Sequence, residues 1–263
     1  MWPTVEDYRR TILEAIRRAG VDCLELWLGD QHLNPRDSNG IMRQAEQLRQ
    51  VGLQPFSIHA PWGDQLEPSA ADPQHRAAWL AVSTAAAALL RVVGGRIVVV
   101  HPSPKITDEE RPERLKRCVE MMGRLAQRCA ELGAVVAVEN MLPAHLGDRA
   151  EELLAMVEPL PRDFAGFCFD TGHAQVCAEG MAIGEAMGDR IVTLHLHDNQ
   201  GQSDEHLLPF SATVDWAHVA RVLDAAQFHG PYIIECAKPS REEVAQNARE
   251  LVERLHALRN GAL

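Results

Sequence analysis

Short apolar runs alternate along the chain with longer helical patterns, and this alternation restricts the fold more than any other feature. The runs are rich in β-branched residues, and glycines stand between several helical stretches and the runs that follow. This order is typical of βα units around a parallel sheet. We expect seven strands, at residues 22–28, 54–60, 96–101, 134–140, 166–170, 191–197 and 232–236.

The helical patterns fit between these runs and complete the βα order. They lie near residues 5–19, 40–51, 74–93, 109–132, 148–157, 178–188, 215–228 and 240–258. Glycines at the expected helix ends should adopt the left-handed conformation, namely Gly20, Gly52, Gly94, Gly95, Gly133 and Gly230. An eight-stranded barrel needs a strand before the first helix, and only Met-Trp-Pro stands there. The sequence therefore predicts a TIM-type (β/α) barrel whose first strand is missing or vestigial.

Length and composition fit one large domain over residues 1–263. A chain of 263 residues with 46% hydrophobic content can bury one large core, since about three quarters of the unfolded surface is hidden at this size. The apolar stretch 77–90 is too short and too rich in alanine for a membrane span, so we expect a buried helix there. The formal net charge of −11 disfavours nucleic acid as a partner, because phosphate binding needs clustered cations.

The cysteines and the N-terminus favour a cytoplasmic protein. The six cysteines show no CxxC spacing and lie mostly in apolar segments, which is typical of reduced core thiols. The first fifteen residues are amphipathic and charged and do not resemble a secretory signal.

Polar, metal-capable residues end the expected strands with unusual regularity. His59, His101, Glu139, Asp170, His195, His197 and Glu235 stand at or near the ends of six successive runs. The carboxyl ends of parallel barrel strands converge on one face, where active sites are built. One such residue alone is usually a satisfied polar group, but a set distributed over six strands indicates a site.

Two nearby motifs enlarge this set. Asp170-Thr-Gly-His173 adds a histidine, and the stretch Leu194–His206 packs three histidines and three acids into thirteen positions, with Asp204 and His206 near its end. Imidazole and carboxylate ligands without thiolates suit zinc, manganese, iron or cobalt. We therefore expect a divalent metal site. His195 and His197 are two apart and should both face the barrel interior, whereas Asp198 fits loop hydrogen bonding as well as metal binding.

The chain resembles the xylose-isomerase-like barrel superfamily, which contains sugar isomerases and epimerases alongside endonuclease IV. The resemblance is carried over about 180 residues by SIHAP (57–61), VVHP (99–102), VAVEN (136–140), FDTGHA (169–174), HLHDNQGQSDEH (195–206), VDW (214–216) and IIEC (233–236).

The resemblance to the ketose epimerase-like members implies a role for each of several residues. Glu139, Asp170, His195 and Glu235 match the metal ligands of those enzymes, in which the two glutamates also move protons through an enediolate. His173 matches a position that contacts substrate, and His197 beside His195 is expected to bind substrate too. This implies a metal-dependent sugar or sugar-phosphate isomerase or epimerase.

The same residues also match endonuclease IV, and this leaves a second reading open. In endonuclease IV, additional residues help to hold three zinc ions that carry out phosphodiester hydrolysis. The matching residues in this chain are His59, His101, His173, Asp204 and His206. Up to three ions are therefore expected. The acidic balance and the scarcity of aromatic residues, with two tyrosines and six phenylalanines, weigh against DNA repair.

Departures from the family pattern keep a third reading open, a barrel that binds a ligand without catalysis. Residues 209–216 lack the Gly-x-Gly turn usual before the Asp-Trp element, and the absent first strand leaves one pocket wall undefined. Lys105 and Lys238 follow strand ends closely and could meet a phosphate, although such lysines are usually solvated. An unfilled strand position also gives the chain a reason to form a homodimer.

Overall fold

The computed structural model describes residues 10–29, 34, 37–63, 65–236 and 241–260, and it contains a single parallel sheet. Six strands follow one another in chain order across the sheet. Their bounds are β1 Cys23–Trp27, β2 Gln54–His59, β3 Ile97–Val100, β4 Val135–Glu139, β5 Ala165–Asp170 and β6 Ile191–His195. Every neighbouring pair is parallel, so the carboxyl ends of all six strands lie at the same edge. The alternation in the sequence therefore predicted these strands correctly.

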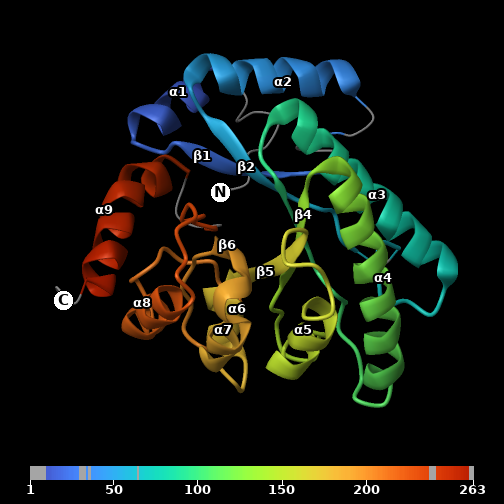
Figure 1. Cartoon of the computed structure of the whole chain (residues 1–263). Helices are drawn as coiled ribbons and strands as arrows, with labels where there is room; N and C mark the ends of the chain where they lie inside the picture. Colours follow the sequence, from blue (N-terminus) through green and yellow to red (C-terminus); the bar gives the residue numbers. More distant parts are fainter. Residues whose placement is uncertain (1–9, 30–33, 35–36, 64, 237–240, 261–263) are drawn as a thin grey trace.

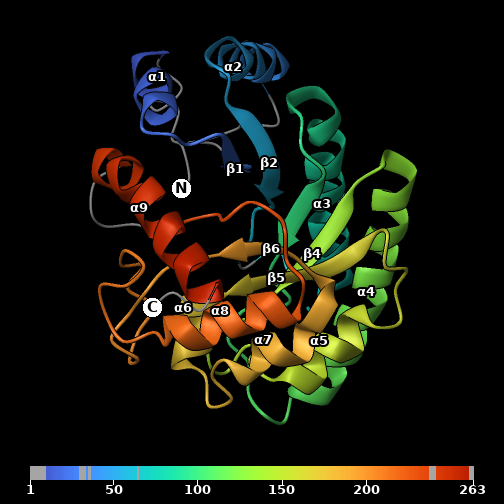
Figure 2. The same cartoon turned by 60° about the vertical axis from the view of Figure 1, so that its left-hand side comes forward.

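Helices cover the outer face of the curved sheet (Figures 1 and 2). Their bounds are α1 Arg10–Arg18, α2 Ser38–Val51, α3 Pro73–Val93, α4 Arg111–Leu132, α5 Ala150–Val157, α6 Thr171–Val176, α7 Ala182–Met187, α8 Trp216–Ala225 and α9 Arg241–Arg259. The main core lies between these helices and the sheet and includes Leu26, Ile58 and Val98. A smaller apolar cluster fills the concave side of the sheet: Ile97, Val99, Val135, Ala137 and Cys168.

The seventh expected strand, at residues 232–236, forms only one β-bridge, so the prediction of a full strand there was wrong. Ile234 pairs in parallel with Leu196. The backbone N–H of Leu196 donates to the Ile233 carbonyl at 2.8 Å, and the N–H of Glu235 donates to the Leu196 carbonyl at 3.1 Å. Pro231, just before this segment, has no N–H to donate and cannot extend the ladder.

An open seam remains between β1 and this bridge. A cavity of about 820 Å³ lies there, lined by residues 20–25 and 228–234 and covered in part by α9. The incomplete barrel agrees with the expected loss of one strand position. Residues 1–9, which precede α1, lie outside the described part of the chain.

Helix α3 shows why an apolar helix need not be buried all round. By length and composition it could cross a membrane, a test that the core helix of a barrel can also pass. It packs one face against the barrel through Trp79, Ala86 and Leu90, while Val92 stays exposed. The expectation of a buried helix at 77–90 is therefore right for one face only.

Two local predictions were wrong. Helix α6 begins directly after β5 because the Asp170 carboxylate accepts the N–H of His173 at 2.6 Å and caps it, and no helix was expected there. After α8 the left-handed position is Gln227, with φ of 51°, and not Gly230. Gly230 is required for space instead, since a Cβ there would lie 2.6 Å from the Phe228 ring.

Candidate metal centre

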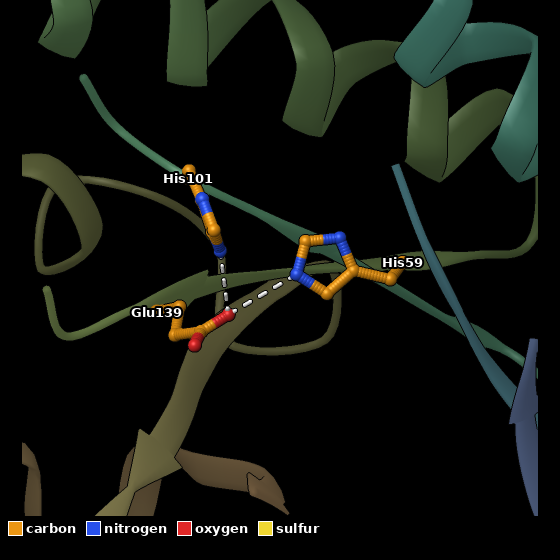
Figure 3. Close-up of side chains that lie close together, drawn as sticks. All are labelled: His59, His101 and Glu139. Carbon is orange, nitrogen blue, oxygen red and sulfur yellow. Dashed lines mark hydrogen bonds and ion pairs between the residues drawn. The ribbon is translucent and has the colours of Figure 1, made fainter. Parts of the chain in front are cut away.

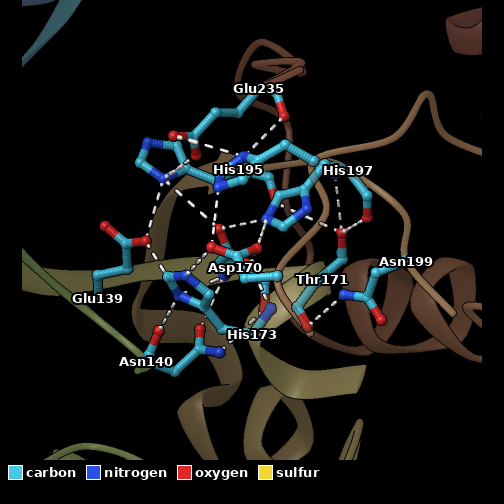
Figure 4. A network of polar contacts seen from close by, with 12 residues as sticks. Glu139, Asn140, Asp170, Thr171, His173, His195, His197, Asn199 and Glu235 are labelled. Carbon is cyan, nitrogen blue, oxygen red and sulfur yellow. Dashed lines mark hydrogen bonds and ion pairs between the residues drawn. The ribbon is translucent and has the colours of Figure 1, made fainter. Parts of the chain in front are cut away.

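The parallel strands bring the polar strand-end residues to one mouth of the barrel. His59 is the last residue of β2, Glu139 ends β4, Asp170 ends β5 and His195 ends β6. His101 follows β3 directly, and Glu235 follows the bridge at Ile234. Figure 4 shows side chains from β4, β5 and β6 and from the segment at Glu235 turned toward one another.

Four of these side chains form the core group, which we define as Glu139, Asp170, His195 and Glu235. One ligand atom from each lies within 4.8 Å of all the others, and all four residues are buried. The Nδ1 atom of His195 is 2.9 Å from a Glu235 oxygen, 3.3 Å from Glu139 and 3.8 Å from Asp170. The two glutamates therefore flank one imidazole nitrogen.

The core group fits a divalent cation. His195 Nδ1 and Glu235 Oε2 are buried without a hydrogen-bond partner, although they face each other. Buried polar atoms are costly when unsatisfied, and a cation between them would satisfy both. Nitrogen and carboxylate oxygen donors are the set that zinc, manganese, iron and cobalt accept.

The charges of the neighbouring imidazoles keep the two glutamates ionised. Burial opposes ionisation of Glu139, but His195 and His101 outweigh it and hold the pKa of Glu139 well below its ordinary value. Burial likewise opposes ionisation of Glu235, and His195 again lowers its pKa. Both side chains are thus carboxylates, the form that binds a cation or removes a proton.

Glu25, which was not among the residues expected from the sequence, orients His195. Glu25 lies mid-way along β1 and is fully buried. Its carboxylate is 2.8 Å from His195 Nε2 and accepts the Ser57 hydroxyl at 2.7 Å. A carboxylate on the far nitrogen fixes the tautomer of a metal-binding histidine and turns the other nitrogen to the ion. The signal was present, since Leu24 and Leu26 face the helices and leave Glu25 for the barrel interior.

His59 and His101 converge on the other side of Glu139. The Nε2 atoms of both imidazoles lie 3.3 Å from the same Glu139 oxygen (Figure 3). Together the three residues form a second possible ligand group. Glu139 would bridge two ions if both groups were filled.

Asp204 and His206 form what we call the outer pair. His206 Nε2 is 2.9 Å from Asp204, and both side chains are about one-fifth exposed, at 22% and 20%. Although burial opposes the imidazolium, the contact with Asp204 raises the pKa of His206 to about 9. His173 Nε2 lies 3.5 Å from Asp204, while its Nδ1 is 2.8 Å from the Asn140 carbonyl. The outer pair is thus an ion pair that leaves one atom, Asp204 Oδ1, buried without a hydrogen-bond partner.

His197 lies below the mouth. It is fully buried, its Nε2 is 3.0 Å from the Asp170 carboxylate, and its ring stacks on His206 with centroids 4.2 Å apart. Gly172 is required for this placement, because a Cβ there would lie 1.9 Å from the His197 ring. His197 could join metal groups with Asp170 and His173 or with His206 and Glu235. Its expected role as a substrate contact stays a prediction.

A cavity of about 420 Å³ opens beside the ligands, and it is of a size that binds small molecules. His101, Glu139, His173, Asp204, His206 and Glu235 line one side. Trp62 and His145 also line it, and sequence reasoning gave neither a role. His145 carried no strand-end signal, because it lies in a loop whose path only the tertiary structure defines.

The other residues that the sequence singled out do not belong to the core group. Asp198 organises its loop: its carboxylate accepts the N–H groups of Ala212 and Val214 and the indole N–H of Trp216 at 3.0 Å each. Lys105 is exposed, and Lys238 lies outside the described residues. In place of the missing glycines, Phe210 adopts a φ of 68°, and its ring is tilted against that of Trp216 with centroids 4.7 Å apart.

Fold and site together define a parallel (β/α) barrel with a histidine–carboxylate centre at its carboxyl-terminal mouth. Residues 13–258 match the family described as xylose isomerase-like TIM barrel, and the chain belongs to this family. MJ1311 of Methanocaldococcus jannaschii is 26% identical over 231 residues, covering 85% of this chain and 77% of that protein. The protein y4fM of Sinorhizobium fredii is 32% identical over 108 residues, 41% of this chain and only 35% of that protein.

Solved structures share the fold across nearly the whole chain. A D-tagatose 3-epimerase-like protein superposes with a TM-score of 0.84 and 22% identity, covering 99% of this chain and 98% of its own. The D-allulose 3-epimerase of Methylomonas sp. gives 0.81 and 19%, covering 96% and 93%. An L-ribulose 3-epimerase gives 0.80 and 20%, covering 98% and 91%. At such low sequence identities, the similarity to these structures supports a shared fold and nothing further.

Proposed function

We propose that the protein is a metal-dependent isomerase or epimerase of small sugars, sugar acids or sugar phosphates. The observation that carries this proposal is the pair of buried carboxylates, Glu139 and Glu235, which lie 3.3 Å and 2.9 Å from His195 Nδ1. Two such groups at one pocket can remove a proton from a carbon beside a carbonyl and return one to either face. The structural neighbours that are 3-epimerases of tagatose-type, allulose and ribulose sugars agree with this chemistry.

Each residue has a proposed role. The core group would hold one divalent cation, which would polarise the sugar carbonyl and acidify the adjacent C–H. Glu139 and Glu235 act as the acid and base, on opposite sides of the reacting carbon. His173 donates from Nδ1 to the Asn140 carbonyl, so its Nε2 faces the cavity and orients a substrate oxygen. The metal is one of zinc, manganese, cobalt or iron.

Solvent exchange tests this proposal directly. The metal-loaded protein is incubated in heavy water with a panel of ketoses, aldoses and their phosphates, and proton NMR follows deuterium entry next to the carbonyl. Exchange in one substrate that Glu139→Gln abolishes is the expected result. Exchange with no sugar of the panel would contradict the proposal.

A second candidate is a multinuclear zinc phosphodiesterase, and one observation favours it. Eight of the nine residues expected from the sequence belong to overlapping groups that could hold a metal ion. The ninth, Asp204, lies 3.5 Å from His173 Nε2. Three ions held there could activate water and stabilise a leaving oxygen. Three zinc ions per chain with cleavage of abasic DNA would support this candidate over the isomerase. The net charge of −11 argues against a DNA substrate.

Location and assembly follow as further parts of the proposal. We infer a cytoplasmic protein, because all six cysteines are free and four of them are buried. The open seam beside β1 gives a second copy a surface to cover, so we expect a homodimer. Light scattering coupled to size-exclusion chromatography measures the mass of the protein in solution and so distinguishes a dimer from a monomer. A barrel that binds a ligand without turnover would show binding of a sugar but no exchange.

A further inference from the structure

A buried asparagine joins the ends of two strands that carry ligands of the core group. Asn140 follows Glu139 directly at the end of β4, and its side chain reaches Asp170 at the end of β5. Asn140 and Asp170 are both fully buried. No role was expected for Asn140 from the sequence, although it ends the stretch VAVEN (136–140). A buried amide needs partners for both its oxygen and its nitrogen, so its contacts show what it holds.

The side-chain amide holds Asp170 by both of its backbone polar groups. The Oδ1 atom of Asn140 accepts the Asp170 N–H at 2.8 Å, and the Nδ2 atom donates to the Asp170 carbonyl at 2.9 Å. Because an N–H needs an acceptor and a carbonyl needs a donor, only one orientation of the amide fits. The backbone that carries the Asp170 carboxylate is therefore fixed from the β4 side.

This amide takes the place of a bond in the ladder between β4 and β5. The N–H of Asn140 donates to the Cys168 carbonyl at 3.4 Å. In a regular parallel ladder the next bond would run from the Asp170 N–H back to the Asn140 carbonyl. Here the side-chain oxygen accepts that N–H, as asparagine side chains can do in competition with the backbone. The Asn140 carbonyl is thereby left for a different donor.

That donor is the imidazole of His173. Its Nδ1 lies 2.8 Å from the Asn140 carbonyl (Figure 4). A carbonyl oxygen only accepts, so Nδ1 carries a proton whether or not the ring is charged. The other ring nitrogen, Nε2, lies 3.5 Å from Asp204, and His173 lines the cavity beside the core group. The Asn140 carbonyl thus sets the rotation of a ring at the cavity wall.

The two residues that Asn140 holds also bond each other. The Asp170 carboxylate accepts the His173 N–H at 2.6 Å, at the start of α6. The three residues therefore form one closed, buried network, in which each hydrogen bond supports the others. Loss of the Asn140 amide should move a ligand of the core group and a histidine of the cavity together.

We propose that Asn140 is a positioning residue for two parts of the site: its side chain places the ligand Asp170, and its carbonyl orients His173. The first part stands on the geometry of the core group. The second rests on the proposed function, in which His173 orients a substrate oxygen. The role needs a donor and an acceptor side by side on a short side chain, and leucine of similar size offers neither.

Asn140→Leu tests this proposal, because it removes both side-chain hydrogen bonds. Metal affinity, measured by competition with a chelator, should fall about 10–100-fold, as when other groups that orient a ligand are lost. In NMR of the zinc-loaded protein, the proton on His173 Nδ1 should be protected from solvent exchange in the wild type and lose this protection in the variant. His173→Gln assigns that signal. At saturating metal, KM should rise about threefold to tenfold, with a smaller change in kcat.

Asn199→Leu is the matched control, because it removes another buried amide close by. That amide donates to the Gly172 carbonyl and accepts the Gly201 N–H, each at 2.8 Å. The control should lower Tm as Asn140→Leu does, while metal affinity and the His173 signal stay as in the wild type. Asn140→Ser leaves room for a water molecule to bridge to Asp170, so it should show the same losses to a smaller extent. It supplies the measurement if the leucine variant does not fold.

The outcomes separate this inference from the proposed function. Wild-type metal affinity with an unchanged His173 signal in the folded Asn140 variants would overturn the inference. Equal losses in Asn199→Leu would overturn it too, because the effect would then be that of any buried amide. Neither measurement uses a sugar. Failure of every sugar to exchange would therefore contradict the proposed function and leave the placement of Asp170 and His173 by Asn140 standing.

Discussion

The core group and the outer pair lie in the same barrel mouth but differ in burial and in the number of ligand atoms that converge there. The core group is wholly buried at strand ends, and its His195 and Glu235 keep atoms without hydrogen-bond partners. The outer pair lies on a loop, about one-fifth exposed, and Asp204 and His206 bond each other at 2.9 Å. The four ligand atoms of the core group lie close enough to share one cation. Asp204 belongs to none of the possible ligand groups among the described residues, although its Oδ1 is also buried without a hydrogen-bond partner. This difference favours one tightly held ion over three.

Loss of a core-group carboxylate should have the largest effect. Glu139→Gln keeps the shape of the side chain but removes both the charge and the proton acceptor. We expect kcat to fall by about 10²–10⁴-fold, the usual contribution of a general base, with little loss of structure by circular dichroism. Glu131→Gln, the same exchange at an exposed site on α4, is the control. An unaltered rate would remove Glu139 from the mechanism.

The role of Glu25 in orienting His195, a member of the core group, can be tested by substitution. Glu25→Gln should weaken metal binding about 10–100-fold, because a partner of this kind orients the ligating histidine. Competition with a chelator measures the affinity, and kcat at saturating metal should change much less. Ser57→Ala, which removes only the hydroxyl that bonds Glu25, should show a smaller loss in the same direction. Unchanged metal affinity in Glu25→Gln would show that His195 needs no such support.

The number of metal ions bound per chain tests whether the outer pair, like the core group, holds an ion. Elemental mass spectrometry should find one ion per chain in the wild-type protein, in Asp204→Asn and in His206→Gln. The reason is that neither side chain is one of the four ligands of the core group. Three ions in the wild type, with loss of one in these variants, would make the outer pair a true metal site and favour the phosphodiesterase.

The smallest expected effect is on how the stability of the metal-free protein depends on pH. The pKa of His206 is raised to about 9 in the folded state, above its unfolded value of about 6.5. Its pairing therefore stabilises the protein fully below pH 6.5, and this contribution is lost as the pH rises through 9. His206→Gln should lower Tm by about 2–4 °C at pH 6, corresponding to about 1 kcal/mol. The difference should vanish above pH 9; a constant difference would contradict the pairing.

Much of the fold could be predicted because its signals are local. The strands from β1 to β6 coincide with short apolar runs of the sequence. Gly52 and Gly133 end helices in the left-handed conformation. The strand-end residues of the core group could be predicted too, since parallel strands bring their ends together whatever lies between them. The single-domain organisation over residues 1–263 stays a prediction, with the family match covering 13–258.

The sequence by itself determined the chemistry available at the mouth, because residue type and position along a strand decide which groups converge there. Only the tertiary structure decided what each group does. The 2.8 Å contact between Glu25 and His195 joins residues 170 positions apart, and the 2.8 Å contact between His173 Nδ1 and the Asn140 carbonyl joins residues 33 positions apart. Hydrogen-bond distances and the presence or absence of a partner are properties of the packed chain. Only they distinguish the buried group of four converging ligand atoms from the partly exposed pair beside it.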